Sequence, residues 1–168
     1  HKIKASFYLK LSSPVVYQRL AEWRAAAALG HELGNHSIYH PCSASQPGME
    51  WVLPYYDLDK YTVEQMREEI MTANAFLKAI DGRAERTLTP PCLHHITGNG
   101  NYLPTIRELF VAIKGAENNP PGSNYLLPAG TGAEELIAFV KKVAEKGGVA
   151  NIIFHGVGGD HLSVSQEA

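Results

Sequence analysis

Apolar residues recur every three or four positions between Val63 and Ile80, which predicts an amphipathic helix. Thr62 and Gln65 have the spacing of a capping box at its start, and Asp81-Gly82 provides a stop. The stripe consists of Val63, Met66, Ile70, Ala73, Leu77 and Ile80. It should pack this helix against a buried sheet.

Three further helices are predicted from their start signals and apolar spacing. Ser13-Pro14 opens a helix that Gly30 ends, and Pro104 opens another that continues through Ile113. Thr131 and Glu134 repeat the capping-box spacing before a helix that runs to Gly147. Each prediction rests on a proline or a cap followed by helical periodicity.

Short apolar runs between these helices predict buried strands. They comprise residues 3–9, 32–37, 87–89 and 149–154, whereas residues 43–59, 93–102 and 118–130 are rich in turn and loop residues. Strands that alternate with helices indicate an α/β fold with a largely parallel sheet. Ligands bind such sheets at the carboxyl ends of their strands.

Composition narrows the classes of function. The chain has 168 residues, of which 45% are apolar and 19% charged, with a formal net charge of -2. These values fit one globular domain. No basic stripe is present, which argues against nucleic acid and anionic membranes as partners. No run of about 18 apolar residues is present to span a membrane.

Three of the eight histidines fall between Gly30 and Cys42. His36 and His40 are four residues apart, a spacing that places two side chains on one face of a helical turn, where they could bind one metal ion. A histidine-rich surface turn is the alternative. Pro91-Cys92 and His155 follow other predicted strands, so all these groups should lie at strand ends.

Two other features leave alternatives open. Cys42 and Cys92 each follow a proline and could form one disulfide in an exported protein or remain two buried thiols. The loop after Cys42 carries Trp51 and Tyr55, whose rings could line a binding groove or cover an edge of the core.

The stretch Gly-His-Glu-Leu-Gly-Asn-His-Ser-Ile-Tyr-His-Pro-Cys, residues 30–42, resembles the metal-binding motif of polysaccharide deacetylases, the NodB-homology family. Residues 4–9 resemble the preceding strand of that family, and residues 152–155 resemble its late Leu-x-His motif. Pro91-Cys92 stands where the family has proline followed by an aromatic residue or cysteine. The resemblance covers most of the chain.

This resemblance implies a distorted, incomplete (β/α) barrel and a divalent metal, with zinc as the expected ion. The chain is then expected to be one partial catalytic domain, residues 1–168, of a hydrolase that removes N- or O-linked acetyl groups from carbohydrate. His36 and His40 are the implied metal ligands, and His155 is the implied general acid. The Cys92 N–H would bind the oxyanion, with Pro91, Trp51 and Tyr55 beside the substrate.

Two departures from the family pattern modify this expectation. The opening Thr-Phe-Asp-Asp-Gly motif, which supplies the catalytic base and the third metal ligand, is not in the sequence and is expected before His1, on the first strand. By itself the chain should therefore bind metal weakly and be inactive. The arginine that usually precedes the proline motif is also replaced, since Thr89 stands two positions before Pro91.

The substrate is expected to be an acetylated polysaccharide or oligosaccharide, and the protein to be secreted or periplasmic. The alternative function is a catalytically inactive carbohydrate-binding domain, or a structural-metal domain, of the same fold.

Overall fold

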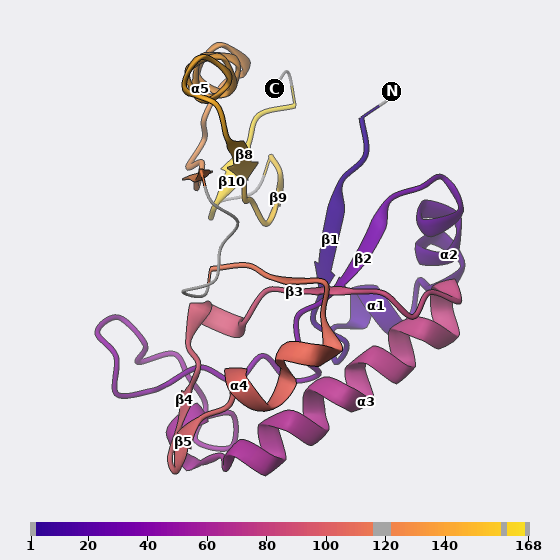
Figure 1. Cartoon of the computed structure of the whole chain (residues 1–168), viewed down its shortest axis with the longest axis vertical. Helices are drawn as coiled ribbons and strands as arrows, with labels where there is room; N and C mark the ends of the chain where they lie inside the picture. Colours follow the sequence, from indigo (N-terminus) through magenta and orange to yellow (C-terminus); the bar gives the residue numbers. More distant parts are fainter. Residues whose placement is uncertain (1–2, 116–121, 159–160, 167–168) are drawn as a thin grey trace. The chain divides into compact units, whose positions relative to one another are not determined.

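A computed structural model of the chain describes residues 3–115, 122–158 and 161–166. The chain forms two compact units, His1–Asn118 and Asn119–Ala168, and each is described by itself. The first unit contains the larger sheet and the histidine-rich turn (Figure 1).

Four parallel strands form the sheet of the first unit. In spatial order they are β1 (Ser6–Leu9), β2 (Glu32–Asn35), β3 (Thr87–Leu88) and β6 (Ala112–Ile113). Asn35 pairs with Leu9 on one side and with Leu88 on the other, so the carboxyl ends of β1, β2 and β3 lie at one edge. Spatial order follows chain order without a reversal, and the fold is mixed α/β, as predicted.

Helix α3 (Val63–Asp81) confirms the predicted stripe and both of its ends. Thr62 Oγ1 accepts a hydrogen bond from the Gln65 N–H at 3.1 Å, and Gln65 Oε1 accepts one from the Thr62 N–H at 2.8 Å. Gly82 follows with a φ of 75°, which a glycine adopts without strain. The helix packs on β2 (Figure 1).

The apolar stripe of α3 contributes to both core clusters of the first unit. Its first half, with Met66 and Ile70, packs with Leu58, Leu88, Tyr102 and Ile106. Its second half, with Ala73 and Leu77, packs with Leu9, Leu33 and Val16. One helix therefore fixes the position of β2, which leads into the histidine turn.

The helix predicted from Pro14 to Gly30 is two helices, α1 (Pro14–Tyr17) and α2 (Leu20–Ala28). The prediction of one continuous helix was wrong because the Trp23 indole N–H donates to the Val15 carbonyl at 2.9 Å. An uninterrupted helix would offer this acceptor to the Arg19 N–H, which instead bonds to Val16. The predicted stop is confirmed, with a φ of 92° at Gly30.

The helix predicted from Pro104 through Ile113 was also too long. Helix α4 (Leu103–Ile106) continues as one 3-10 turn, η3 (Arg107–Leu109), and the chain then enters β6. The Val111 N–H bonds to the Arg86 carbonyl and the Lys114 N–H to the Leu88 carbonyl. Pairing with β3 therefore replaces the last helical turn.

The remaining elements of the first unit surround the loops at the carboxyl edge. They are the 3-10 turns η1 (Leu58–Lys60) and η2 (Pro91–Leu93) and the hairpin of β4 (Ile96–Thr97) with β5 (Gly100–Asn101).

The second unit pairs β7 (Ser123–Leu126) with β8 (Val149–Ile152) in parallel, and α5 (Ala133–Lys146) packs on β8. β9 (Gly156–Val157) pairs with β10 (Ser163–Val164). A strand thus lies within the stretch 118–130 predicted to be turns, of which 118–121 fall outside the described residues. The capping box at Thr131 was wrong, since Gly132 caps α5 and Thr131 bridges to Val164.

Across the ranges that the structure describes, every helix is too short or too polar to cross a membrane.

Candidate functional site

His36 leaves the carboxyl end of β2 and is oriented by the neighbouring strand. Its Nδ1 lies 2.6 Å from the carbonyl oxygen of Thr89, directly after β3. Because a carbonyl oxygen only accepts hydrogen bonds, Nδ1 carries a proton, and in the neutral imidazole the lone pair then lies on Nε2. Backbone carbonyls orient many metal-binding histidines in this way.

His40 reaches His36 through a loop. The two ring centroids are 4.6 Å apart, with 78° between the ring planes. The expected proximity is present, but the helical turn is not, because Ser37 and His40 have φ values of 61° and 62°. Non-glycine residues seldom adopt this backbone conformation, so surrounding contacts must hold it.

Asn35 and Ser37 supply such contacts from within the motif. The buried Asn35 side chain donates to the Ile70 carbonyl on α3 and accepts from the Ser37 N–H at 2.8 Å. The Ser37 hydroxyl accepts from the His40 N–H at 2.9 Å. Asn35 thus connects the turn to α3, and Ser37 fixes the backbone that carries His40.

Gly34 has a separate packing reason to be in the motif. The Tyr8 ring crosses it from β1, and its hydroxyl lies 2.6 Å from Thr87 Oγ1 on β3. A Cβ at position 34 would lie 2.6 Å from that ring. The glycine in β2 therefore leaves room for the Tyr8 ring, which crosses from β1 over β2 and contacts β3.

Glu69 on α3 also holds the turn, a role that was not predicted from the sequence. Its carboxylate accepts from the Ile38 N–H at 3.0 Å and from the Tyr39 N–H at 2.9 Å. Burial raises the pKa of the Tyr61 hydroxyl, and the Glu69 charge raises it further. A charged residue directly before Ile70 in the apolar stripe was the available signal.

Glu69→Leu should lower the free energy of unfolding by about 2–4 kcal/mol. Two partly buried backbone N–H groups lose their acceptor, and an unsatisfied donor costs up to roughly 1–3 kcal/mol when it is buried. Urea denaturation measures the change, with Glu68→Leu, an exposed neighbour on the same helix, as the matched control. Equal effects of the two variants would contradict the role of Glu69.

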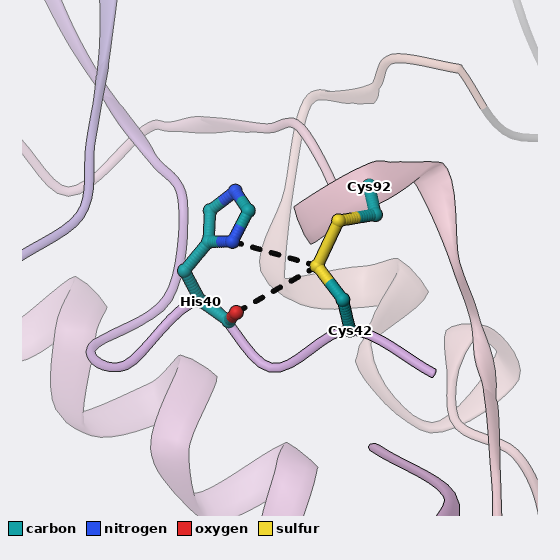
Figure 2. A group of neighbouring side chains, drawn as sticks. All are labelled: His40, Cys42 and Cys92. Carbon is teal, nitrogen blue, oxygen red and sulfur yellow. Dashed lines mark hydrogen bonds between the residues drawn. A yellow bond between two sulfur atoms is a disulfide. The ribbon is translucent and has the colours of Figure 1, made fainter. Parts of the chain in front are cut away.

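A disulfide between Cys42 and Cys92 joins the histidine turn to the loop after β3, with the two Cα atoms 5.8 Å apart. The disulfide alternative is therefore the one observed. His40 Nδ1 lies 3.5 Å from Cys42 Sγ (Figure 2). Pro91 is buried, and Cys92, with a φ of 53°, turns the chain away from the strand.

His36 and His40 fit a divalent metal as two nitrogen ligands. Zinc prefers such ligands, but it also needs a third protein group. Such a group and the two histidines would have to place their ligand atoms within 4.8 Å of one another. Within the described ranges, no Asp or Glu does so. The assignment of His36 and His40 as metal ligands therefore stays a prediction, although their rings lie side by side.

His94, the residue directly after η2, supports the same loop. Its Nδ1 accepts a hydrogen bond from the Ser43 N–H at 3.1 Å, which requires that nitrogen to be unprotonated. Burial lowers the pKa of His94; the nearby Asp59 charge opposes this shift, and His95 adds to it.

The protein should lose stability as the pH falls from 7 to 5, in part through His94. With a folded-state pKa below the ordinary value of about 6.5, the unfolded chain takes up the proton first, and folding becomes less favourable. His94→Asn keeps an acceptor near the Nδ1 position but does not titrate. Urea denaturation at both pH values should show a smaller loss for this variant, and an equal loss would contradict the assignment.

Aromatic side chains lie beside His40. The Trp51 ring centroid is 6.5 Å from that of His40, and Tyr56 stacks on Tyr39 at 5.4 Å and meets Tyr55 edge-on at 4.5 Å. Trp51 is 58% exposed and Tyr55 66% exposed. This exposure argues against coverage of the core, and a role of these rings in binding stays a prediction.

His155 belongs to the second unit, where it follows β8. Its backbone N–H donates to the Leu162 carbonyl at 2.7 Å, and its ring lies 5.2 Å from that of His161. Partial burial lowers the pKa of His155, and His161 lowers it further. The role of general acid toward His36 and His40 stays a prediction, because it depends on the placement of the two units.

Comparison with known proteins gives a match to one family and to a few solved structures. The family model described as polysaccharide deacetylase matches residues 1–103, and no curated protein matches the chain. Two mutants of BA3943, described as a CE4 family pseudoenzyme, align over 91% of this chain at 15% identity and a TM-score of 0.50. One of these mutants is described as having restored enzymatic activity.

Wild-type BA3943 from Bacillus anthracis aligns over 91% of this chain at 15% identity, with a TM-score of 0.44. The chain covers 46%, 47% and 55% of the three structures, so it spans about half their length. At this identity the two mutants support the α/β fold alone.

The matched residues include β1, β2, the histidine turn and Cys92, and they make up more than half of the sequence. The chain belongs to the polysaccharide deacetylase family.

Proposed function

We propose that this chain forms part of a metal-dependent hydrolase that removes acetyl groups from carbohydrate. The pairing of His36 and His40 at the carboxyl edge of the sheet, with ring centroids 4.6 Å apart, carries the proposal. It is supported by membership of the polysaccharide deacetylase family. In this proposal the four parallel strands of the first unit are an arc of the incomplete (β/α) barrel.

His36 and His40 are the residues that would hold a divalent ion, with zinc as the best match to imidazole ligands. When bound, such an ion supplies a Lewis acid and lowers the pKa of water. The Thr89 carbonyl keeps the His36 lone pair on Nε2. Asn35, Ser37 and Glu69 hold the loop that places His40 beside it.

The remaining roles fall to groups around the loop. The backbone N–H of Cys92 is the proposed donor to the developing oxyanion. Its peptide is fixed by the disulfide and by the hydrogen bond of the Leu93 N–H to the Pro90 carbonyl. His155 is proposed to protonate the leaving amine or alkoxide, a transfer that an imidazolium can perform near neutral pH.

The exposed rings of Trp51 and Tyr55 are proposed to stack against sugar faces, with Pro91 in the wall of the site. Trp51 is well placed for this role because its ring lies next to His40. The Cys42–Cys92 disulfide supports a secreted or periplasmic protein, because disulfides persist in oxidising compartments.

Acetate release by the protein produced from its complete gene tests this function. Acetylated xylan, chitooligosaccharide and peptidoglycan are offered with zinc or cobalt, and with a chelator as the control. Release that requires the metal supports the proposal. Carbohydrate binding without release, with either metal, would point instead to a catalytically inactive binding domain.

A further inference from the structure

His40, Cys42 and Cys92 form a compact cluster on two loops of the first unit, here called the His40–Cys42–Cys92 triad. Their three potential ligand atoms lie within 4.8 Å of one another. Figure 2 shows the His40 ring directed at the sulfur of Cys42, with Cys92 on the adjoining turn. The proposed deacetylase function uses His40 but neither sulfur.

The separation between His40 Nδ1 and Cys42 Sγ matches that of two ligands on one zinc ion. With bonds of about 2.05 Å to nitrogen and about 2.3 Å to sulfur at a tetrahedral angle, the N···S separation is roughly 3.6 Å. The observed distance between His40 Nδ1 and Cys42 Sγ is 3.5 Å. In the disulfide the two sulfurs are bonded to each other, so they must separate and become thiolates before they can bind zinc.

We propose that reduction of the Cys42–Cys92 disulfide creates a zinc site with His40 Nδ1 and the two cysteine thiolates as ligands. A dithiol supplies the two electrons and two protons that open the bond, and it leaves as its own disulfide. Each new thiol then loses its proton as the metal binds. Water occupies the fourth position of the tetrahedron.

Hydrogen bonds outside the disulfide keep the ligands together after reduction. The Cys42 N–H bonds to the Tyr56 carbonyl at 3.2 Å, and the Cys42 carbonyl accepts from the Leu58 N–H at 2.9 Å. On the other loop, the His94 N–H bonds to the Pro91 carbonyl at 2.9 Å. Cys92 is half-buried whereas Cys42 is fully buried, so a dithiol attacks at Cys92.

His40 cannot serve both metal sites at once, because a neutral imidazole has one lone pair for a metal. Metal in the triad therefore withdraws His40 from its partner His36. Reduction in the presence of zinc would then switch the deacetylase off, and reoxidation would restore it. This consequence rests on the proposed function, whereas metal binding by the triad does not.

Cobalt(II) absorption tests the site directly. The chain is reduced with a dithiol, freed of reductant under nitrogen and titrated with cobalt. We expect a thiolate-to-cobalt charge-transfer band and tetrahedral visible bands that saturate at one equivalent. The oxidised chain should show no charge-transfer band, because His36 and His40 offer nitrogen alone.

Variants assign the ligands. Cys92→Ser should lose a large part of the charge-transfer band, and His40→Ala should weaken cobalt binding roughly tenfold or more, since even outer-shell groups contribute 10–100-fold. His31→Asn is the matched control: His31 precedes β2, accepts a hydrogen bond from the Ala5 N–H and is not a proposed metal ligand, so this variant should leave both band and affinity unchanged.

Three results would overturn the proposal. They are the absence of a charge-transfer band after reduction, equal cobalt affinity in the reduced wild type and His40→Ala, and loss of helical circular dichroism on reduction. The test is separable from the proposed function: a complete cobalt–thiolate spectrum in a protein that never releases acetate would reject the deacetylase and leave the triad standing.

Discussion

In the protein produced from its complete gene, His36→Ala should reduce metal-dependent acetate release by at least about 100-fold. Loss of an outer-shell partner of a metal ligand already costs 10–100-fold, and this substitution removes an entire proposed ligand. The Thr89 carbonyl also accepts a hydrogen bond from His36 Nδ1, which orients the ring and leaves Nε2 to face a metal. Acetate release and bound zinc are measured on the same preparation, and both should fall together.

His31→Asn is the matched control for this variant. His31 lies in the same motif but precedes β2, whereas His36 follows it, so the two are at opposite ends of one strand. The His31 Nδ1 accepts a hydrogen bond from the Ala5 N–H at 3.1 Å, and an asparagine can keep that acceptor. Normal zinc content in His36→Ala, or equal loss of acetate release in both variants, would reject His36 as a ligand.

Arg86→Met should lower the free energy of unfolding by about 3–5 kcal/mol, the largest stability effect we expect in this chain. Arg86 forms two hydrogen bonds of 2.8 Å with the Asp81 carboxylate, and the side chains are 2% and 0% exposed. Removal of one partner leaves a buried charge without compensation, which costs this much. Arg86 also donates to the Leu33 carbonyl and thereby connects β2 to the end of α3.

The pKa of Asp81 fits this account. Burial opposes its ionisation, but the hydrogen bonds and charge of Arg86, together with the N–H and charge of Arg83, outweigh burial and lower the pKa of Asp81. The pair therefore stabilises the fold above the ordinary carboxyl pKa of about 3.9, and this contribution is lost as the pH falls through the folded-state value.

An exposed ion pair supplies the control for Arg86. Arg19 and Glu22 lie 3.1 Å apart with side chains 61% and 59% exposed, so Arg19→Met should cost far less stability than Arg86→Met. Chemical denaturation of both variants, together with Asp81→Leu/Arg86→Met, completes the test. The double variant should be more stable than Arg86→Met because no unpaired charge remains. Equal losses from Arg86→Met and Arg19→Met would contradict the prediction.

Local signals in the sequence predicted the elements whose ends are fixed by neighbouring residues. Helix α3 has the predicted stripe, cap and stop because the groups concerned lie within four residues of one another. The elements that failed depend on distant partners. The helix after Pro104 ends early because its continuation pairs with β3, and β7 forms in a turn-rich stretch because β8 pairs with it.

The sequence by itself determined the family resemblance, the α/β class and the proximity of His36 to His40. Their motif is contiguous, so its chemistry can be read along the chain. Only the tertiary structure showed why the two rings meet, because Thr89 and Glu69 contact the turn from other elements. It also decided the disulfide, since residues 50 positions apart in sequence can bond only when the fold brings their Cα atoms within reach.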